Sequence, residues 1–95
     1  MNSSSQPYPL SDNEFTLEHI QVGEFGKITA IHADVDLQQR LAALGLRPGC
    51  LVQVLRKASF SGPIHVRVGT TEVIMRRSEA LRIVTAPLVD LAVGI

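Results

Sequence analysis

The sequence is poor in cysteine and in aromatic side chains. Its 95 residues include one cysteine, Cys50, no tryptophan, one tyrosine and three phenylalanines. A single cysteine excludes an intrachain disulfide, which suits a reducing compartment. Proteins that bind single-stranded nucleic acid stack bases on aromatic side chains, so the low aromatic content argues against that class.

A long apolar run is also missing. No stretch approaches the roughly 20 consecutive apolar residues that a membrane-spanning helix needs. The first residues contain serine and proline but no basic segment followed by an apolar one, so we expect no signal peptide. These absences predict a cytoplasmic protein without membrane insertion.

Catalytic patterns are equally scarce. The sequence has no P-loop, no G-x-G-x-x-G and no nucleophile elbow around any serine. Residues 37–88 contain only two carboxylates, Glu72 and Glu79, and neither has a second carboxylate close in sequence. We therefore predict that the protein is not an enzyme, has no catalytic residues and needs no cofactor.

Four side chains could ligate a metal ion, but none pairs with another at a short spacing such as C-x-x-C or H-x-x-x-H. They are His19, His32, His65 and Cys50. Imidazole and carboxylate groups are suitable ligands for ferrous iron. A fold can also bring together ligands that are distant in sequence. The spacing predicts no dedicated metal site, and Cys50 is interpreted as a small apolar side chain of the core.

Charge is unevenly distributed although its sum is zero. Residues 1–36 carry six acidic residues and one lysine, whereas residues 37–86 carry eight basic and two acidic residues. The two halves can interleave in the fold and cancel, or the basic segment can form a face for an acidic surface, nucleic acid or lipid headgroups. Arginine presents a planar donor fork suited to carboxylate and phosphate, and the candidates for such a face are Arg67, Arg76, Arg77 and Arg82.

Short apolar segments separated by turn residues predict a mostly β fold. Apolar and polar residues alternate cleanly in residues 64–68, and Gly69-Thr70 fits a two-residue hairpin loop. Residues 78–80 are predicted to form a single helical turn, with Ser78 as its cap. The expected strands are residues 26–32, 51–56, 64–68, 71–76 and 81–84. Five short strands predict a small barrel, which the pattern alone does not resolve into an SH3-like or an OB-like type.

One short helix is predicted after the first strand. Asp36 is its expected N-cap, with Gln39 three residues later as in a capping box. Leu37, Leu41 and Leu44 then share one helical face.

The end of this helix is predicted from its glycines and prolines. Gly45 fits the left-handed position after the last turn, and Leu46 can fold back on the helix. Pro48-Gly49 is expected to form a turn.

Four runs of the sequence resemble the FeoA family, in the family's order and spacing. Residues 40–49 (RLAALGLRPG) resemble its RLxxLGLxPG motif, and residues 62–68 (GPIHVRV) resemble GPxxVxV. Residues 75–83 are similar to LRxxEAxxI, and residues 16–28 to the family's opening. Eight residues of these motifs are interpreted as structural: Leu41, Leu44, Gly45, Leu46, Pro48, Gly49, Gly62 and Pro63.

The resemblance implies a small SH3-like β-barrel of about five strands and one short helix, at residues 14–85. It implies an accessory of ferrous iron uptake whose partner is the cytosolic region of a FeoB-like transporter, so that it would lie at the inner membrane through that transporter. Two other functions stay open. One is a small barrel that binds nucleic acid, which the basic segment permits although none is expected as a partner. The other is a stand-alone metal-responsive domain, by analogy with the SH3-like domain of iron-dependent repressors.

The two ends of the chain are expected to differ from the barrel. Residues 1–13 are predicted to be a flexible lead and residues 86–95 an apolar tail. Leu88, Leu91 and Ile95 would line one face if the tail were helical. The tail is interpreted as a strand or turn packed on the barrel, as a segment for homo-oligomerisation or partner docking, or as a frayed end. These three residues and the four arginines are the candidate partner-binding residues.

Overall fold

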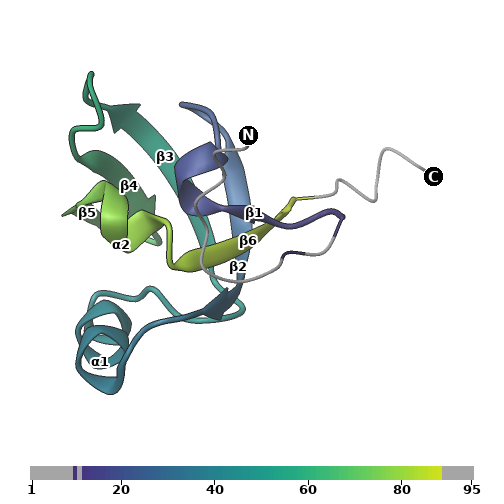
Figure 1. Ribbon diagram of the computed structural model, residues 1–95, viewed down its shortest axis with the longest axis vertical. Coiled ribbons are helices and arrows are strands. Elements are labelled where there is room, and N and C mark those ends of the chain that lie inside the picture. The colour runs from purple at the N-terminus through teal and green to yellow at the C-terminus, as the bar shows by residue number, and fades with distance from the viewer. Residues whose placement is uncertain (1–9, 11, 89–95) are drawn as a thin grey trace.

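The computed structural model describes residue 10 and residues 12–88, which form one sheet with short helices (Figure 1). The elements are β1 (Phe15–Thr16), the 3₁₀ helix η1 (Leu17–His19), β2 (Phe25–Ile31), α1 (Val35–Ala43), β3 (Leu51–Lys57), β4 (Ile64–Val68), β5 (Thr71–Met75), α2 (Arg77–Ala80) and β6 (Ile83–Pro87). In this part of the chain no helix has the length and apolar character needed to cross a membrane.

The six strands are antiparallel and follow the order β1-β6-β2-β3-β4-β5. The last strand, β6, therefore lies between the first two, so that distant parts of the sequence close the sheet. The register shifts between Ile28 and Ala30 on β2 and between Val54 and Arg56 on β3. Such irregularities bend a strand and increase its twist, which lets a six-stranded sheet curl around one core.

The core is built from residues that alternate along the strands. On β4 Ile64, Val66 and Val68 are buried, as their alternation predicted. The two-residue loop at Gly69 is confirmed, since Val68 pairs with Thr71 and Gly69 has φ +61°. Cys50 is half-buried and packs against the core, as interpreted from the sequence.

The helix α1 begins two residues earlier than predicted. Asp34, not Asp36, is its N-cap, and Oδ1 of Asp34 accepts a hydrogen bond of 2.8 Å from the backbone N–H of Leu37. Gln38 supports this start by donating a hydrogen bond to the carbonyl of Ala33. Either aspartate can cap a helix, and the earlier start leaves the charge of Asp36 in the first turn, where the helix dipole favours it.

The end of α1 is the one the sequence predicted. Gly45 has φ +98°, its N–H binds the carbonyl of Ala42, and the N–H of Leu46 binds the carbonyl of Leu41. This pair of bonds is a Schellman motif, and both leucines are buried in the core. The motif turns the chain back from α1 toward β3.

Two local expectations need correction. Ser78 does not cap α2: the N-cap is Arg76, whose N–H donates to Oε1 of Glu79 at 3.1 Å. The sequence also gave no signal for β1 or η1, because two paired residues and one 3₁₀ turn are too short for a periodic pattern. The sheet thus has six strands where about five were expected, while the mostly β fold is confirmed.

Candidate functional site

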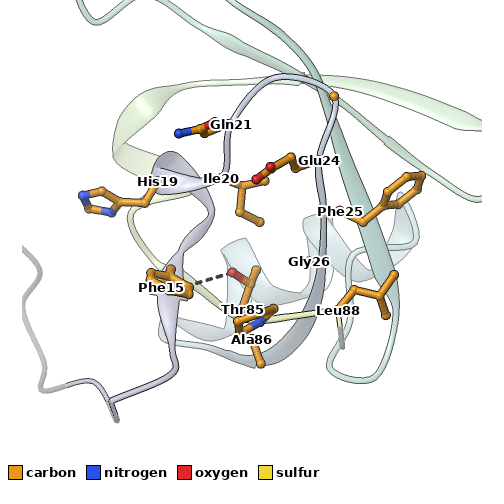
Figure 2. A pocket seen from close by; sticks show the side chains of 12 residues that line it. Phe15, His19, Ile20, Gln21, Glu24, Phe25, Gly26, Thr85, Ala86 and Leu88 are labelled. Atoms are coloured by element: carbon orange, nitrogen blue, oxygen red, sulfur yellow. Dashed lines mark hydrogen bonds between the residues drawn. The ribbon is translucent and has the colours of Figure 1, made fainter. Parts of the chain in front are cut away.

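A groove of about 610 Å³ opens between η1, the start of β2 and the end of β6. Figure 2 shows its side chains, which come from both ends of the described chain. We call it the Phe15–Phe25 groove; its lining residues are Phe15, His19, Ile20, Gln21, Gly23, Glu24, Phe25, Gly26, Thr85, Ala86, Pro87 and Leu88.

The walls of the Phe15–Phe25 groove are apolar and incompletely covered. Phe15, Phe25 and Leu88 are 42%, 46% and 50% exposed. A single exposed apolar side chain is ordinary on a protein surface, but three around one groove form an exposed apolar patch. The groove is therefore chemically suited to an apolar segment.

The floor of the groove is held by a buried polar contact and a glycine. Thr85 is fully buried, and its Oγ1 donates a hydrogen bond of 3.0 Å to the carbonyl of Phe15 (Figure 2). A Cβ atom on Gly26 would lie 2.5 Å from Cδ1 of Ile20 and 3.1 Å from Cβ of Thr85. Only glycine therefore fits here without displacing the floor.

A second groove, of about 500 Å³, lies between α1, β5 and α2. We call it the helix–strand groove; its lining residues are Arg40, Leu41, Leu44, Pro63, Val73, Ile74, Met75, Arg76 and Glu79. Ile74 is 69% exposed and Leu44 41% exposed, so apolar side chains stand beside two arginines. The groove runs beside β5, which ends the sheet, and terminal strands can pair with an added extended segment.

The four candidate arginines have different surroundings. Arg67 donates to Oε2 of Glu72 at 3.1 Å, and Arg82 donates to the carbonyl of His32 at 3.4 Å. Arg76 lines the helix–strand groove. Arg77 belongs to the polar cluster described next.

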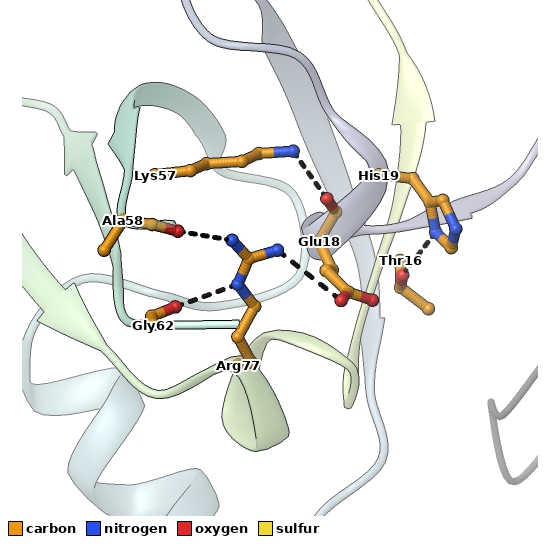
Figure 3. Close-up of polar contacts among 7 residues, drawn as sticks. All are labelled: Thr16, Glu18, His19, Lys57, Ala58, Gly62 and Arg77. Carbon is orange, nitrogen blue, oxygen red and sulfur yellow. Dashed lines mark hydrogen bonds and ion pairs between the residues drawn. The ribbon is translucent and has the colours of Figure 1, made fainter. Parts of the chain in front are cut away.

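Arg77 joins three parts of the chain (Figure 3). Its Nε and Nη2 donate to the carbonyls of Gly62 and Ala58 at 2.9 and 3.0 Å, and its Nη1 lies 3.6 Å from Oε2 of Glu18. Nζ of Lys57 donates to the backbone carbonyl of Glu18 at 2.7 Å. Burial, together with the charge of Arg77, lowers the pKa of Lys57. The cluster fastens the β3–β4 loop to η1 and α2.

The three apolar candidates of the tail are only partly visible. Leu88 forms a wall of the Phe15–Phe25 groove, where the last described residues lie. Leu91 and Ile95 fall outside the described residues, as does most of the expected flexible lead.

The candidate metal ligands have other partners or lie apart. Nδ1 of His19 is 2.9 Å from Oγ1 of Thr16, and Nε2 of His65 is 3.0 Å from Oε1 of Glu72. Within residue 10 and residues 12–88, no three His, Cys, Asp or Glu side chains are grouped closely enough to hold a metal ion.

Neither groove was predicted from the sequence. Phe25 and Lys27 alternate with the buried Gly26 and Ile28, a pattern that places Phe25 on an outward face. This alternation predicts only that Phe25 is exposed. The groove itself forms because β6 pairs with β2, and no local sequence pattern predicts that pairing.

Comparison with known proteins points to one family. The FeoA domain model matches residues 15–87. No curated protein sequence is similar enough to count as a match.

Three solved structures are similar to this chain. The solution structure of FeoA from Chlorobium tepidum has 32% identity and a TM-score of 0.74, over 79% of this chain and 71% of the other. A crystal structure named as an iron uptake regulatory protein, FeoA, has 28% identity and a TM-score of 0.73, over 79% and 99%. Stenotrophomonas maltophilia FeoA complexed with zinc, described as a prokaryotic SH3 domain protein, has 29% identity and a TM-score of 0.65, over 75% and 88%.

Proposed function

The chain belongs to the FeoA family, and from that premise we propose that it is an accessory module of ferrous iron uptake, which acts by docking on the cytosolic region of a FeoB-like transporter. The SH3-like barrel expected from the sequence is confirmed by the likeness to family structures. The proposed location is the cytoplasm, at the inner membrane through the transporter.

The main support for docking is the helix–strand groove. Ile74 and Leu44 expose apolar surface beside the guanidinium groups of Arg40 and Arg76. Apolar contacts flanked by arginine are typical of the residues that dominate binding energy at protein interfaces. A segment of the transporter that combines apolar and acidic side chains would match this groove.

Docking regulates a transporter only if it favours one state over another. A bound module shifts an equilibrium by its difference in affinity for the two states. We propose that this chain binds one nucleotide state of the transporter's G-protein domain more tightly than the others.

The surroundings of the arginines favour a protein partner over nucleic acid. Arg67 is paired with Glu72, and Arg77 is engaged with two carbonyls and Glu18. Binding of nucleic acid gains free energy when lysine or arginine side chains neutralise phosphates and release counterions. An arginine that is already paired with a carboxylate contributes less to this gain. Arg76 and Arg82 remain proposed partner-binding residues.

The test is a titration against the purified cytosolic domain of the cognate transporter, with and without guanine nucleotide. Binding that differs between nucleotide states is expected. Ile74→Glu is expected to weaken it at least tenfold, because it places a charge in an apolar contact. Val35→Glu is the matched control, since Val35 is exposed on α1 but does not line the groove. The absence of binding at tens of micromolar in every nucleotide state would refute the proposal.

A further inference from the structure

We propose that the helix–strand groove binds an extended segment of the transporter, which adds to the sheet as a further strand beside β5. This inference rests on the proposed function and states how the docking occurs. The segment combines apolar residues with a carboxylate that reaches Arg40 and Arg76.

The sheet ends at two strands that differ in how they are protected. β1 has two residues, whereas β5 has five and pairs with β4 in a continuous register (Figure 1). Proteins commonly shorten, bulge or cover an edge strand, or place lysine or proline on it, because its unpaired backbone groups can pair with another chain. β5 contains neither residue type and no register shift. In the described part of the chain no further strand pairs with it, so this edge is open to an added strand.

The hairpin register shows which backbone groups of β5 face the open edge. Val68 pairs with Thr71 across a two-residue loop, so these two residues exchange hydrogen bonds. Hydrogen-bonded and non-hydrogen-bonded pairs alternate along an antiparallel ladder. Val73 therefore bonds to β4, while the N–H and C=O groups of Glu72 and Ile74 point outward. Two donors and two acceptors are thus presented to a partner strand.

The open edge ends where α2 begins. The next outward N–H is that of Arg76, which donates to Oε1 of Glu79 at 3.1 Å. The carbonyl of Arg76 accepts from the N–H groups of Glu79 and Ala80, both at 3.0 Å. The added strand is therefore limited to the length of β5, and five extended residues span about 17 Å.

The side chains of β5 show what the added strand has to carry. Residues directly opposite each other on neighbouring strands point to the same face of the sheet. Val73 and Met75 point into the core, to which Leu41 of α1 also belongs, and all three line the groove. Ile74 points to the opposite face and is mostly exposed. An apolar residue opposite Val73 would pack toward α1, and an apolar residue opposite Ile74 would cover that side chain.

The charge of the groove favours an acidic segment. Arg40 and Arg76 line the groove, and among the described residues neither forms an ion pair, unlike Arg67 and Arg77. Glu79 is the acidic residue of the lining, and its carboxylate accepts from the backbone of Arg76. A carboxylate on the added segment would therefore find guanidinium groups that have the geometry to bind it.

Hydrogen exchange tests the strand addition at single amides. In the free chain the amides of Glu72 and Ile74 are expected to exchange fast, and that of Val73 slowly. Saturation with the transporter's purified cytosolic domain is expected to slow exchange at Glu72 and Ile74 at least tenfold. The amide of Val35, the first residue of α1 and outside the groove, is the control and is expected to be unchanged.

The two ways of failing are distinguishable in this experiment. A bound domain that leaves the amides of Glu72 and Ile74 unprotected would overturn the strand addition, while docking itself would stand. The absence of binding in every nucleotide state would refute the docking proposal, and the strand addition with it.

An ester in place of one peptide bond removes a single donor from the edge. Cys50 allows the chain to be joined by ligation at the Gly49–Cys50 bond, so that residues 50–95 can be synthetic. Replacing the N–H of Ile74 by oxygen keeps its side chain and is expected to weaken binding about two- to tenfold, the contribution of one hydrogen bond. The same ester at Thr70, which is exposed and outside the groove, is the control. Equal affinities of the two ester chains would contradict the added strand.

A second copy of the chain is the competing occupant of this edge. Two β5 strands would pair with each other and protect the amides of Glu72 and Ile74 without any transporter. The free chain is expected to be monomeric by light scattering, with the same exchange rates over a hundredfold dilution. Protection in the free chain that is lost on dilution would assign the edge to a second copy and overturn the proposal.

Discussion

The Nη1 atom of Arg77 lies 3.6 Å from Oε2 of Glu18, while the same guanidinium donates hydrogen bonds to two carbonyls of the β3–β4 loop (Figure 3). One side chain of α2 thus joins the loop to η1, an element that is distant from both in sequence. Because Arg77 is also a candidate for partner binding, its effect on stability has to be measured before its effect on binding.

Replacing Arg77 by lysine is expected to lower the free energy of unfolding by about 1–2 kcal/mol. Lysine keeps the charge near Glu18 but lacks the fork that reaches both carbonyls, and hydrogen bonds to charged groups contribute about 1.5–3 kcal/mol each at most. For a domain of this size the loss corresponds to a fall in Tm of roughly 5–10 °C. Arg76→Lys is the control, because Arg76 is exposed. Equal melting curves for both variants would show that the Arg77 contacts add no stability.

Gly62→Ala is expected to destabilise the β3–β4 loop through a specific clash. A Cβ atom at this position would lie 2.7 Å from Cβ of Ala58 and 3.1 Å from the carbonyl oxygen of Ser59. Neither atom can swing away, so the backbone must shift, at a cost of about 1–3 kcal/mol.

The clash at Gly62 can be checked by a second substitution. Ala58→Gly removes the nearest atom, so the double variant should lose less stability than the two single variants together, by at least about 0.5 kcal/mol in denaturant unfolding. Strict additivity would mean that Ala58 is not what makes glycine necessary at position 62.

The ion pair of Glu72 predicts that the folding stability depends on pH. Its hydrogen bond with Arg67, helped by His65, lowers the pKa of the carboxyl below its ordinary value of 4.5. A carboxyl whose pKa is lower in the folded state contributes stability that is complete above its unfolded pKa and is lost as the pH falls through its folded pKa. Because Glu72 is exposed, we expect a small effect. Glu72→Gln should lower Tm at pH 7, and the difference should fade as the pH falls below 4.5.

The control for Glu72 is Glu24→Gln, which makes the same change in net charge at another exposed position. It corrects for the general effect of charge on Tm. A Tm difference for Glu72→Gln that stays constant from pH 7 to below 4.5 would show that ionisation of Glu72 is not linked to folding.

The elements that sequence predicted are those encoded by neighbouring residues. The end of α1 was predictable from Gly45 and Leu46, and the β4–β5 loop from Gly69. Both features depend only on neighbouring residues, because a left-handed residue or a two-residue turn is set by local chemistry. The start of α1 was misplaced for the same kind of reason, since Asp34 and Asp36 satisfy the capping rule equally well.

The candidate sites depend instead on contacts between distant residues. Phe15, Phe25 and Leu88 line one groove only because β6 inserts between β1 and β2. Arg77 was recognised as a candidate for its donor fork, but its partners, Ala58 and Glu18, lie far away in sequence. Periodicity describes which face a residue takes, and it contains no information on which faces meet.

The β3–β4 loop holds a further residue that sequence gave no reason to notice. Phe60 is fully exposed and has φ 58°, and Ser61 follows with φ 64°. A left-handed conformation costs a residue other than glycine about 1–2 kcal/mol, and is a genuine outlier for a bulky side chain. Since Phe60 has no packing to lose, Phe60→Asn is expected to raise the free energy of unfolding by about 0.5–1 kcal/mol, because asparagine tolerates this conformation.

Ser59→Asn is the control for Phe60, because Ser59 is also exposed and is not among the described residues with positive φ. It should leave Tm unchanged, whereas Phe60→Asn should raise Tm by roughly 3–5 °C. A strained, exposed aromatic residue has two possible reasons to persist. Either the surrounding structure imposes the backbone conformation, or the side chain contacts a partner. The same variant titrated against the transporter's cytosolic domain distinguishes the two reasons: weaker binding by a more stable chain indicates a contact residue, and unchanged binding indicates that the loop alone imposes the strain. A Phe60→Asn variant that melts at a lower temperature would mean that Phe60 stabilises the loop and that its backbone is not strained.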